Sequence, residues 1–436
     1  MPVVIRDAWL MDIDPPHARY GALRIDGQQI TAVGPQVNPQ PGDEVVDAGG
    51  AVVLPGLVNG HAHLYSALAV GMPPPQQAPS TFHQILERVW WRLDRALDLP
   101  LVEMSASIGA IDALRSGTTT LIDHHASPSA IDGSLDAIEA GLSAAGLRGL
   151  LCYETTDRNG RPGRDAGLAE NERYHRRCLA RQDQRFGAMA GAHAAFTLSD
   201  ESLAAIADLA KRFGSGVHIH VAEDPCDAAI CRDQYGADLV DRLDRSGVLA
   251  VPSILAHATH LAPTDLARIN HTPIVLAHNP RSNMNNAVGY APLPRSTRPV
   301  LLGTDGLGSD MLAELAAAWF KARDAHAGLT PADCVAMLAA SARKASELLG
   351  IELGRLTAAA AADLVLTDYM PATPLNDDNV GGHLIFGLSG RGPRSVMVAG
   401  QWRLRNREVV GADEAHLRHQ ALRQARRLWS RMGEMQ

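Results

Sequence analysis

Two histidines stand one residue apart in the stretch LPGLVNGHAHLYSAL, residues 54–68. On a β-strand successive side chains point to opposite faces, so His61 and His63 would project the same way, about 6.6 Å apart along the chain. Two imidazole rings at that separation can bind one metal ion, and they are a poor choice if they only fill an apolar core. The pair therefore predicts a metal site at the end of a strand.

Polar side chains recur at the ends of later strand-like segments. Between residues 55 and 355 these segments alternate with helical ones, and eight of them end near His63, His124, Tyr153, His193, His220, His257, His278 and Asp305. Alternation at this pace predicts a parallel (β/α)8 barrel of the TIM type, and barrel enzymes carry their catalytic residues at the carboxyl ends of the strands. We therefore expect these side chains to meet at one barrel mouth.

Four of the side chains at these strand ends make up the predicted ligand set: His61, His63, His220 and Asp305. Imidazoles with one carboxylate suit Zn²⁺ or Fe²⁺, because Ca²⁺ and Mg²⁺ prefer oxygen ligands. We predict one divalent ion, with zinc preferred and iron as the alternative. Such an ion lowers the pKa of bound water from ~15.7 to about 7. The competing interpretation, buried histidines hydrogen-bonded within a core, fits a single histidine better than this set.

Both ends of the chain are rich in strand patterns. Residues 3–54 alternate around the hairpin dipeptide Asp26-Gly27, and the last part of the chain returns to the same style. We expect the two ends to build one small β-sandwich domain. The predicted organisation is therefore the first part of this domain in residues 1–54, the barrel in 55–355, and the second part with a terminal helix in 356–436.

Composition argues against several classes of protein. The chain has 436 residues, of which 20% are charged, and a formal net charge of −8, which disfavours nucleic-acid binding. Its arginine-rich end, residues 416–432, has helical apolar spacing and is expected to pack as a helix. Five scattered cysteines predict no disulfide framework. Because we find no signal-peptide pattern and no membrane-spanning apolar run, we expect a cytoplasmic protein without a membrane partner.

Five segments together resemble the amidohydrolase superfamily: PGLVNGHAHLYSAL, HIHVAED, LAHATHL, AHNPRSNMNNAVG and GTDGLGSDM. Within it the chain is similar to the cytosine/guanine-deaminase-like branch, which includes triazine hydrolases. RVWWRLDRAL, IDHHASP and CYETTDRNG resemble SsnA-type aminohydrolases, and DHH also resembles 8-oxoguanine deaminases. The resemblance spans the whole chain and implies a distorted (β/α)8 barrel with a small β-sandwich domain built from both termini.

The resemblance also implies roles for particular side chains. The family's metal ligands match His61, His63, His220 and Asp305. Glu223 matches the carboxylate that carries a proton to the substrate ring, and His257 matches the histidine that orients the water or the developing oxyanion. Asp305 would take the proton of the water and pass it to departing ammonia. Dinuclear relatives have a bridging lysine on the fourth strand, and its absence from this sequence favours one ion.

A further group of residues is expected to contact the substrate. His193 ends the predicted fourth strand, where relatives use a histidine on the substrate, although the residues that follow it here depart from the family pattern. The other candidates are His124 and His125 after the second strand, Trp90 and Arg92 after the first strand, and Asn283. An aromatic ring beside an arginine can stack on a flat heterocycle, while a packed position in the core is the alternative for Trp90.

These inferences predict a mononuclear metal-dependent aminohydrolase. It would deaminate a purine, pterin or pyrimidine-like small molecule by attack of metal-bound hydroxide and release ammonia. One alternative keeps the attack but expels chloride or an alkylamine from a triazine-like ring. Cyclic-amide hydrolysis is disfavoured by the missing lysine, and a non-catalytic binding protein is disfavoured because no metal ligand is missing. By analogy with relatives, a homodimer is expected.

Overall fold

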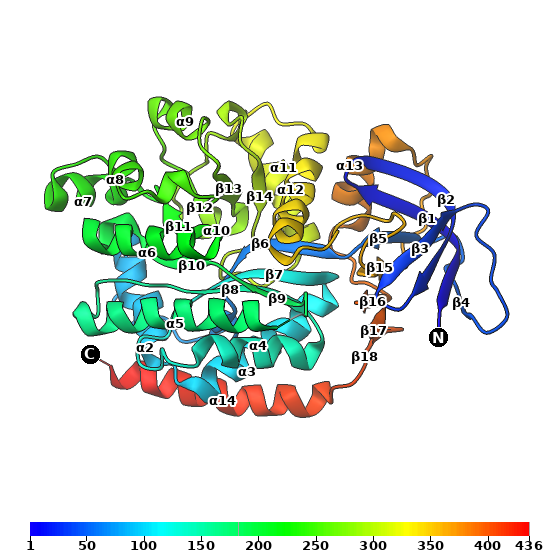
Figure 1. Ribbon diagram of the computed structural model, residues 1–436, viewed down its shortest axis with the longest axis horizontal. Coiled ribbons are helices and arrows are strands. Elements are labelled where there is room, and N and C mark those ends of the chain that lie inside the picture. Colours follow the sequence, from blue (N-terminus) through cyan, green and yellow to red (C-terminus); the bar gives the residue numbers. More distant parts are fainter. Residues whose placement is uncertain (182, 436) are drawn as a thin grey trace.

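A (β/α)8 barrel and a strand-rich domain make up the chain (Figure 1). The computed structural model describes residues 1–181 and 183–435. The parallel strands of the barrel are β6 (Leu57–Ala62), β7 (Thr118–His125), β8 (Arg148–Tyr153), β9 (Phe186–Ala188), β10 (Ala190–Ala194), β11 (Val217–Val221), β12 (Ile254–His257), β13 (Val275–His278) and β14 (Val300–Leu302). β9 and β10 share one position, so these strands fill the eight expected positions. The predicted fold class is confirmed.

The strand ends lie close to where the sequence places them. Seven of the eight end within one residue of the predicted position, and only β14 ends earlier, at Leu302, before Asp305. The barrel interior is filled by apolar side chains from its strands, including Val58, Ile122, Leu150, Ile254 and Leu301. This packed interior leaves the carboxyl ends of the strands as the place for polar side chains.

The barrel is distorted because its hydrogen bonding is interrupted twice. β6 to β9 form one sheet and β10 to β14 form another. Isolated bridges join the two sheets, Ala62 to Asp305 on one side and Thr155 to Ala192 on the other. The backbone N–H of Asp305 also donates to the carbonyl of His61 at 2.9 Å. The closure between β6 and β14 therefore brings two predicted metal ligands together.

Helices cover the outside of the barrel (Figure 1). The main ones are α3 (Leu99–Arg115), α4 (Ser134–Ala145), α5 (Gly160–Ala180), α6 (Asp200–Phe213), α7 (Pro225–Tyr235), α8 (Leu239–Arg245), α9 (Pro263–Ile269), α11 (Met311–Asp324) and α12 (Pro331–Leu349). α6 shows why they form. Ser199 caps its N-terminus, Gly214 ends it in the left-handed conformation, and Leu203, Ile206 and Leu209 are buried at helical spacing.

Shorter helical segments follow several of the barrel strands. They are η1 (Leu64–Ala69), α1 (Phe82–Ile85), η2 (Leu86–Trp90), α2 (Trp91–Ala96), η3 (Ala195–Thr197), η4 (Val248–Ala250), α10 (Pro280–Asn285) and η5 (Leu293–Arg295). The segments from α1 to α2 come from the long connection between β6 and α3. They contribute residues to the cavity described below, as do η1 and α10.

Strands from both ends of the chain form one nine-stranded sheet (Figure 1). They are β1 (Val3–Ile13), β2 (Pro16–Asp26), β3 (Gln29–Gly34), β4 (Glu44–Asp47), β5 (Val52–Pro55), β15 (Leu364–Leu366), β16 (Ser395–Val398), β17 (Gln401–Arg405) and β18 (Glu408–Val409). β5 and β15 are antiparallel, with Pro55 opposite Leu364, and this pair joins the two ends. Hydrogen bonding thus runs through a single sheet, and side chains from both ends, such as Leu23 and Met397, share one core.

The terminal helix α14 (Glu414–Glu434) packs along the barrel, against α2 and α3. Leu428 is fully buried there, and the indole N–H of Trp429 donates to the carbonyl of Leu68 at 3.0 Å. The remaining short helical segments after the barrel are η6 (Asp377–Asn379), α13 (Val380–Gly382) and η7 (His383–Leu388). The predicted C-terminal region therefore divides, with its strands in the terminal sheet and its last helix on the barrel wall.

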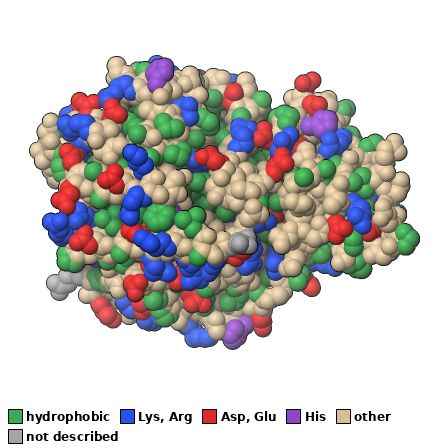
Figure 2. All heavy atoms as spheres, in the orientation of Figure 1, with side chains coloured by type: hydrophobic (Ala, Val, Ile, Leu, Met, Phe, Trp, Pro, Cys, Tyr) green, Lys and Arg blue, Asp and Glu red, His purple; other side chains and the backbone are tan. Residues whose placement is uncertain are grey.

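The surface carries both signs of charge. On the face shown in Figure 2, Lys and Arg side chains are interspersed with Asp and Glu side chains. Typical ion pairs join Asp136 to Arg173 at 3.1 Å and to Arg177 at 2.8 Å. Within residues 1–181 and 183–435, no helix is both long enough and apolar enough to cross a bilayer.

Candidate active site

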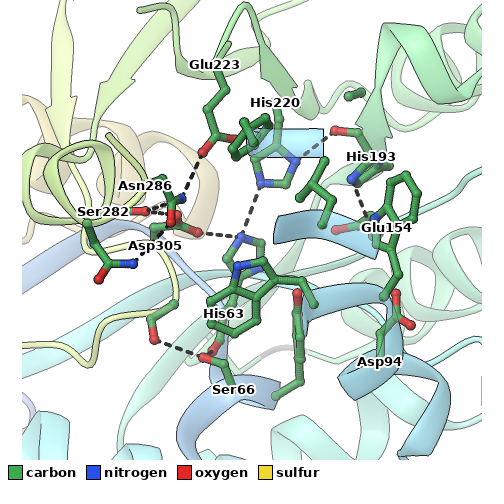
Figure 3. A pocket seen from close by; sticks show the side chains of 18 of the residues that line it. His63, Ser66, Asp94, Glu154, His193, His220, Glu223, Ser282, Asn286 and Asp305 are labelled. Atoms are coloured by element: carbon green, nitrogen blue, oxygen red, sulfur yellow. Dashed lines mark hydrogen bonds and ion pairs between the residues drawn. The ribbon is translucent and has the colours of Figure 1, made fainter. Parts of the chain in front are cut away.

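Four predicted ligands meet at the mouth of the barrel. Figure 3 labels three of them, His63, His220 and Asp305. Oδ1 of Asp305 lies 2.9 Å from Nε2 of His63 and 3.6 Å from Nε2 of His61. Nε2 of His63 is 3.2 Å from Nε2 of His220. One ligand atom from each of the four residues lies within 4.8 Å of the others. The structure thus brings together side chains that come from both ends of the barrel sequence.

Backbone carbonyls orient two of the imidazole rings. Nδ1 of His63 donates to the carbonyl of His124 at 2.5 Å, and Nδ1 of His220 donates to the carbonyl of His193 at 2.8 Å. A ring that donates through Nδ1 carries its lone pair on Nε2 when it is neutral. Both Nε2 atoms therefore point to the shared centre, where each ring in its neutral form offers a lone pair to a metal ion.

The third ring shows that the site fits an ion. Nε2 of His61 is buried and has no hydrogen-bond partner, an arrangement that costs free energy unless something binds there. Burial also lowers the pKa of His61 to about 3, so the ring is neutral. Three imidazoles and one carboxylate form a donor set typical of zinc or another first-row divalent ion. The residues that would hold this ion are His61, His63, His220 and Asp305.

The backbone is strained at three positions around this centre. The φ angles of His257, Asp305 and Ala222 are 72°, 54° and 49°, in the left-handed region that residues other than glycine rarely adopt. Such conformations persist only where the surrounding structure imposes them, and they are concentrated at functional sites. Here they occur in two predicted catalytic residues and in the residue before Glu223.

Glu223 lies beside His257 in the wall of the cavity. Its Oε2 is 3.4 Å from Nε2 of His257, and its Oε1 accepts from Nδ2 of Asn286 at 3.3 Å. Burial, and next the charge of Asp305, raise the pKa of Glu223 well above its usual range. Nδ1 of His257 donates to Oδ1 of Asn283 at 2.8 Å, which leaves Nε2 directed at the site. Glu223 is therefore held as a proton donor next to an oriented imidazole.

The pKa of Asp305 is shifted in the opposite direction to that of Glu223. Burial acts to raise its pKa, but the neighbouring imidazoles of His61 and His63 outweigh that effect and hold the pKa of Asp305 well below its usual range. The hydroxyl of Ser282 donates to its second oxygen. The site thus contains one buried carboxyl that keeps its proton and one that loses it, a pairing suited to general acid–base catalysis.

A cavity of about 730 Å³, open to solvent, lies over these groups. Its polar wall includes the ligands His63, His220 and Asp305 together with Glu223 and His193. Its apolar wall is formed by Phe82, Leu86, Trp90, Trp91, Phe196 and Leu307. Trp90 and His193 therefore lie where a substrate contact requires them. The mixed polar and apolar lining is typical of a pocket for a small molecule.

Three other predicted substrate residues lie outside the lining. His124 is fully buried, with Nε2 3.0 Å from the carbonyl of Ala192, and Nε2 of His125 is 2.8 Å from the hydroxyl of Ser127. Asn283 holds the ring of His257. They are placed behind the cavity, where they support the residues that face it.

Arg92 is not in the cavity at all. Its guanidinium donates to the backbone carbonyls of Met432 and Met435, at the end of α14. This contradicts the predicted contact with substrate, because the side chain points towards the terminal helix. Its sequence neighbour Asp94 faces the cavity instead.

Three acidic residues of the cavity wall were not among the candidates from the sequence: Glu154, Asp94 and Asp227. Nη2 of Arg158 lies 3.2 Å from Oε1 of Glu154 and 3.4 Å from Oδ2 of Asp94, and its guanidinium stacks 4.4 Å from the ring of Trp91. Burial raises the pKa of Asp94 to about 7 against the opposing charge of Arg158. Glu154 directly follows β8, so its position at a strand end was a usable signal, whereas Asp94 lies on a helix and offered none.

The chain is similar to a known protein family and to named enzymes. The model of the amidohydrolase family matches residues 52–403. A 5-methylthioadenosine/S-adenosylhomocysteine deaminase of Moorella thermoacetica is 30% identical over 94% of this chain and 96% of its own length. A 5'-deoxyadenosine deaminase of Methanosarcina mazei is 29% identical over 99% of each chain.

Solved structures share the fold. A zinc-bound adenosine deaminase from Xanthomonas campestris superposes with a TM-score of 0.83 at 24% identity, covering 98% of each chain. An atrazine chlorohydrolase from Arthrobacter aurescens, in complex with zinc, gives a TM-score of 0.81 at 22% identity, covering 97% of this chain and 100% of the other. The family match over most of the chain confirms the predicted superfamily: this protein belongs to the amidohydrolase family.

Proposed function

We propose that this protein is a metal-dependent aminohydrolase that replaces the amino group of a nitrogen heterocycle with oxygen and releases ammonia. The observation that carries the proposal is the buried Glu223 carboxyl, held beside His257 and facing the same cavity as the metal ligands. Both curated relatives described above are named as deaminases of adenosine derivatives, and they match almost the whole chain. Because both relatives are named as deaminases, the similarity supports a reaction in which this protein removes an amino group from a ring carbon.

We propose a single divalent ion, zinc with iron as the alternative. Three imidazoles and one carboxylate support this choice, as does the absence of lysine from β9 and β10. When bound, the ion lowers the pKa of a water molecule to about 7 and so makes hydroxide available at neutral pH.

The side chains of the protein divide the proton transfers between them. Asp305 accepts the proton of the attacking water, and Nε2 of His257 accepts a hydrogen bond that orients it. As the carbon–oxygen bond forms, Glu223 donates a proton to the ring nitrogen beside the amino-bearing carbon. Asp305 then passes its proton to the amino group, the carbon–nitrogen bond breaks, and ammonia leaves. Glu223 takes back the proton of the new hydroxyl group, so both carboxyl groups return to their starting states. One water is consumed, and the ring carbon keeps its oxygen as a carbonyl.

Ammonia release by the metal-loaded protein tests the proposal. The panel is purines, oxidised purines, pterins, pyrimidines and aminotriazines, with Glu223→Gln as the matched inactive variant. We expect one ring to yield ammonia and the corresponding ring carbonyl in equal amounts. Release of chloride or an alkylamine without ammonia would favour the triazine-type alternative. If the metal is bound and no ring in the panel releases ammonia, the proposal is contradicted. The homodimer stays a prediction, which sedimentation velocity would test.

A further inference from the structure

Two hydrogen-bond acceptors face each other across a gap in the cavity wall. Oε1 of Glu154 lies 3.8 Å from Nε2 of His193, which is too far for a direct hydrogen bond. Both residues line the cavity, and Figure 3 shows them together beside His220. The ligand-type atoms of Glu154, His193 and His220 lie within 4.8 Å of one another. This gap is therefore next to the reaction centre.

Hydrogen bonds to Thr197 set the tautomer of His193. The hydroxyl of Thr197 donates its single hydrogen to the carbonyl of Ala194 at 3.0 Å. It must therefore accept the hydrogen of Nδ1 of His193, which lies 2.7 Å away. Nε2 of His193 is left with a lone pair, so it acts as an acceptor towards the gap.

Glu154 is held as a carboxylate. Its Oε1 accepts from Nη2 of Arg158 at 3.2 Å. The guanidinium of Arg158 is fixed in turn by Thr156 Oγ1 at 3.2 Å and by the ring of Trp91. A carboxylate oxygen and an imidazole lone pair cannot bond to each other, and a group that donates an N–H between them would satisfy both.

The position of this gap relative to Glu223 limits the substrate. In Figure 3 Glu223 and Glu154 lie on opposite sides of His220. A ring whose amino-bearing carbon sits over the metal site presents one flanking atom to each of them. Glu223 needs an unprotonated ring nitrogen to receive its proton, whereas Glu154 and His193 need a donor.

We propose that Glu154 and His193 bind a ring N–H, and that the substrate is a cyclic guanidine in which the amino-bearing carbon lies between one bare nitrogen and one N–H nitrogen. This inference rests on the proposed aminohydrolase function and narrows its substrate class. In adenine-type rings, such as those in the names of the relatives, the second neighbour is a carbon, so neither acceptor gains a partner. The lone pair of His193 and the part of Oε1 of Glu154 that faces the cavity would then stay unpaired beside a buried carbon, which disfavours such a ring.

Isocytosine and cytosine are the matched probes, because these isomers differ in whether an N–H flanks the amino-bearing carbon. Their dissociation constants are measured by calorimetry on metal-loaded Glu223→Gln protein, in which turnover of the rings is expected to be slowed ~10²-fold or more. We expect isocytosine to bind at least about tenfold more tightly than cytosine, because one charge-assisted hydrogen bond contributes a difference of that size. Adding Glu154→Gln, which replaces an acceptor oxygen with a donor amide, should remove most of that preference.

Two further variants separate this role from general damage. Thr197→Val removes the acceptor for Nδ1 of His193 and should reduce the preference for isocytosine, while Glu347→Gln, at an exposed glutamate, should leave it unchanged. Metal content is measured for every variant. If the Glu154→Gln protein loses its metal ion, the inference is tested by the effect of Thr197→Val on the preference for isocytosine.

The outcomes distinguish this inference from the proposed function. Equal binding of the two isomers, or a preference that survives both Glu154→Gln and Thr197→Val, overturns the inference. If wild-type protein then releases ammonia from adenine-type rings, the proposed function still stands. Failure of the proposed function shows separately, as the absence of ammonia from every ring tested with the metal-loaded wild-type protein.

Discussion

Nδ1 of His61 donates to Nε2 of His218 across 2.8 Å, and this contact leaves Nε2 of His61 free to face the metal site. His218 and His220 lie two residues apart on β11, so both point into the barrel. One of them is a predicted ligand and the other orients a ligand. Contacts of this kind fix the tautomer and direction of a metal-binding ring.

The first prediction concerns metal affinity. His220→Asn removes a ligand and should abolish most metal binding, whereas His218→Asn should weaken affinity by about 10–100-fold, because it removes only the partner that orients His61. Competition with a chromophoric chelator measures both effects. His271→Asn, at an exposed histidine, is the control and should bind metal as the wild type does. Equal affinity of His218→Asn and wild type would show that this contact is dispensable.

The second prediction separates catalysis from metal binding. Glu223→Gln keeps the shape of the side chain but removes the acidic proton, so ammonia release should fall ~10²-fold or more while bound metal is retained. Turnover and metal content are measured on the same preparation, with Glu347→Gln as the surface control. Wild-type turnover in Glu223→Gln would show that another group protonates the ring.

The third prediction follows from the proton on His63 in the metal-free protein. Burial disfavours the charged ring, but the hydrogen bond and charge of Asp305 outweigh it and raise the pKa of His63 to about 9. An ion must displace this proton from Nε2, so binding should release one proton below about pH 9. Apparent affinity should then rise about tenfold per pH unit up to that value and level off above it.

Proton release on zinc addition in weakly buffered solution measures this directly. His220→Asn, which lacks a ligand, should release little or none. An affinity that does not change between neutral pH and pH 9 would show that His63 is already unprotonated when the metal is absent.

The fourth prediction tests the position of Arg92. Because its guanidinium donates to the carbonyls of Met432 and Met435, Arg92→Ala should leave substrate affinity within about twofold and lower the free energy of unfolding by roughly 1–3 kcal/mol. Chemical denaturation and ligand titration measure the two effects. Arg95→Ala, an exposed arginine on the same helix, should change stability less. A large loss of substrate affinity in Arg92→Ala would show that Arg92 contacts the substrate after all.

The barrel and its ligand set were predictable because their signals are local. Each strand of the barrel is a short apolar run, and the residue type at its end is visible in the sequence next to it. His61, His63 and His220 could therefore be assigned from spacing alone. The resemblance to a family added the roles of Glu223 and His257, which spacing alone does not distinguish from other polar residues at strand ends.

The substrate side of the site was decided by tertiary structure. Arg92 and Asp94 are two residues apart on α2, and at 3.6 residues per turn they project in nearly opposite directions. The sequence does not say which of them faces the barrel mouth, and packing against α14 settles it. Asp94 then meets Arg158, which is 64 residues away along the chain.

What the sequence determined by itself was therefore the strand order, the strand ends and the ligand types, since each depends on a pattern within one element. Only the fold decided how the elements meet. The hydrogen bond between His61 and His218 determines which nitrogen of His61 faces the metal site. The packing of α2 against α14 places Asp94, and not Arg92, in the cavity wall. Both depend on contacts between distant segments, whose free energies are realised only when the whole barrel has closed.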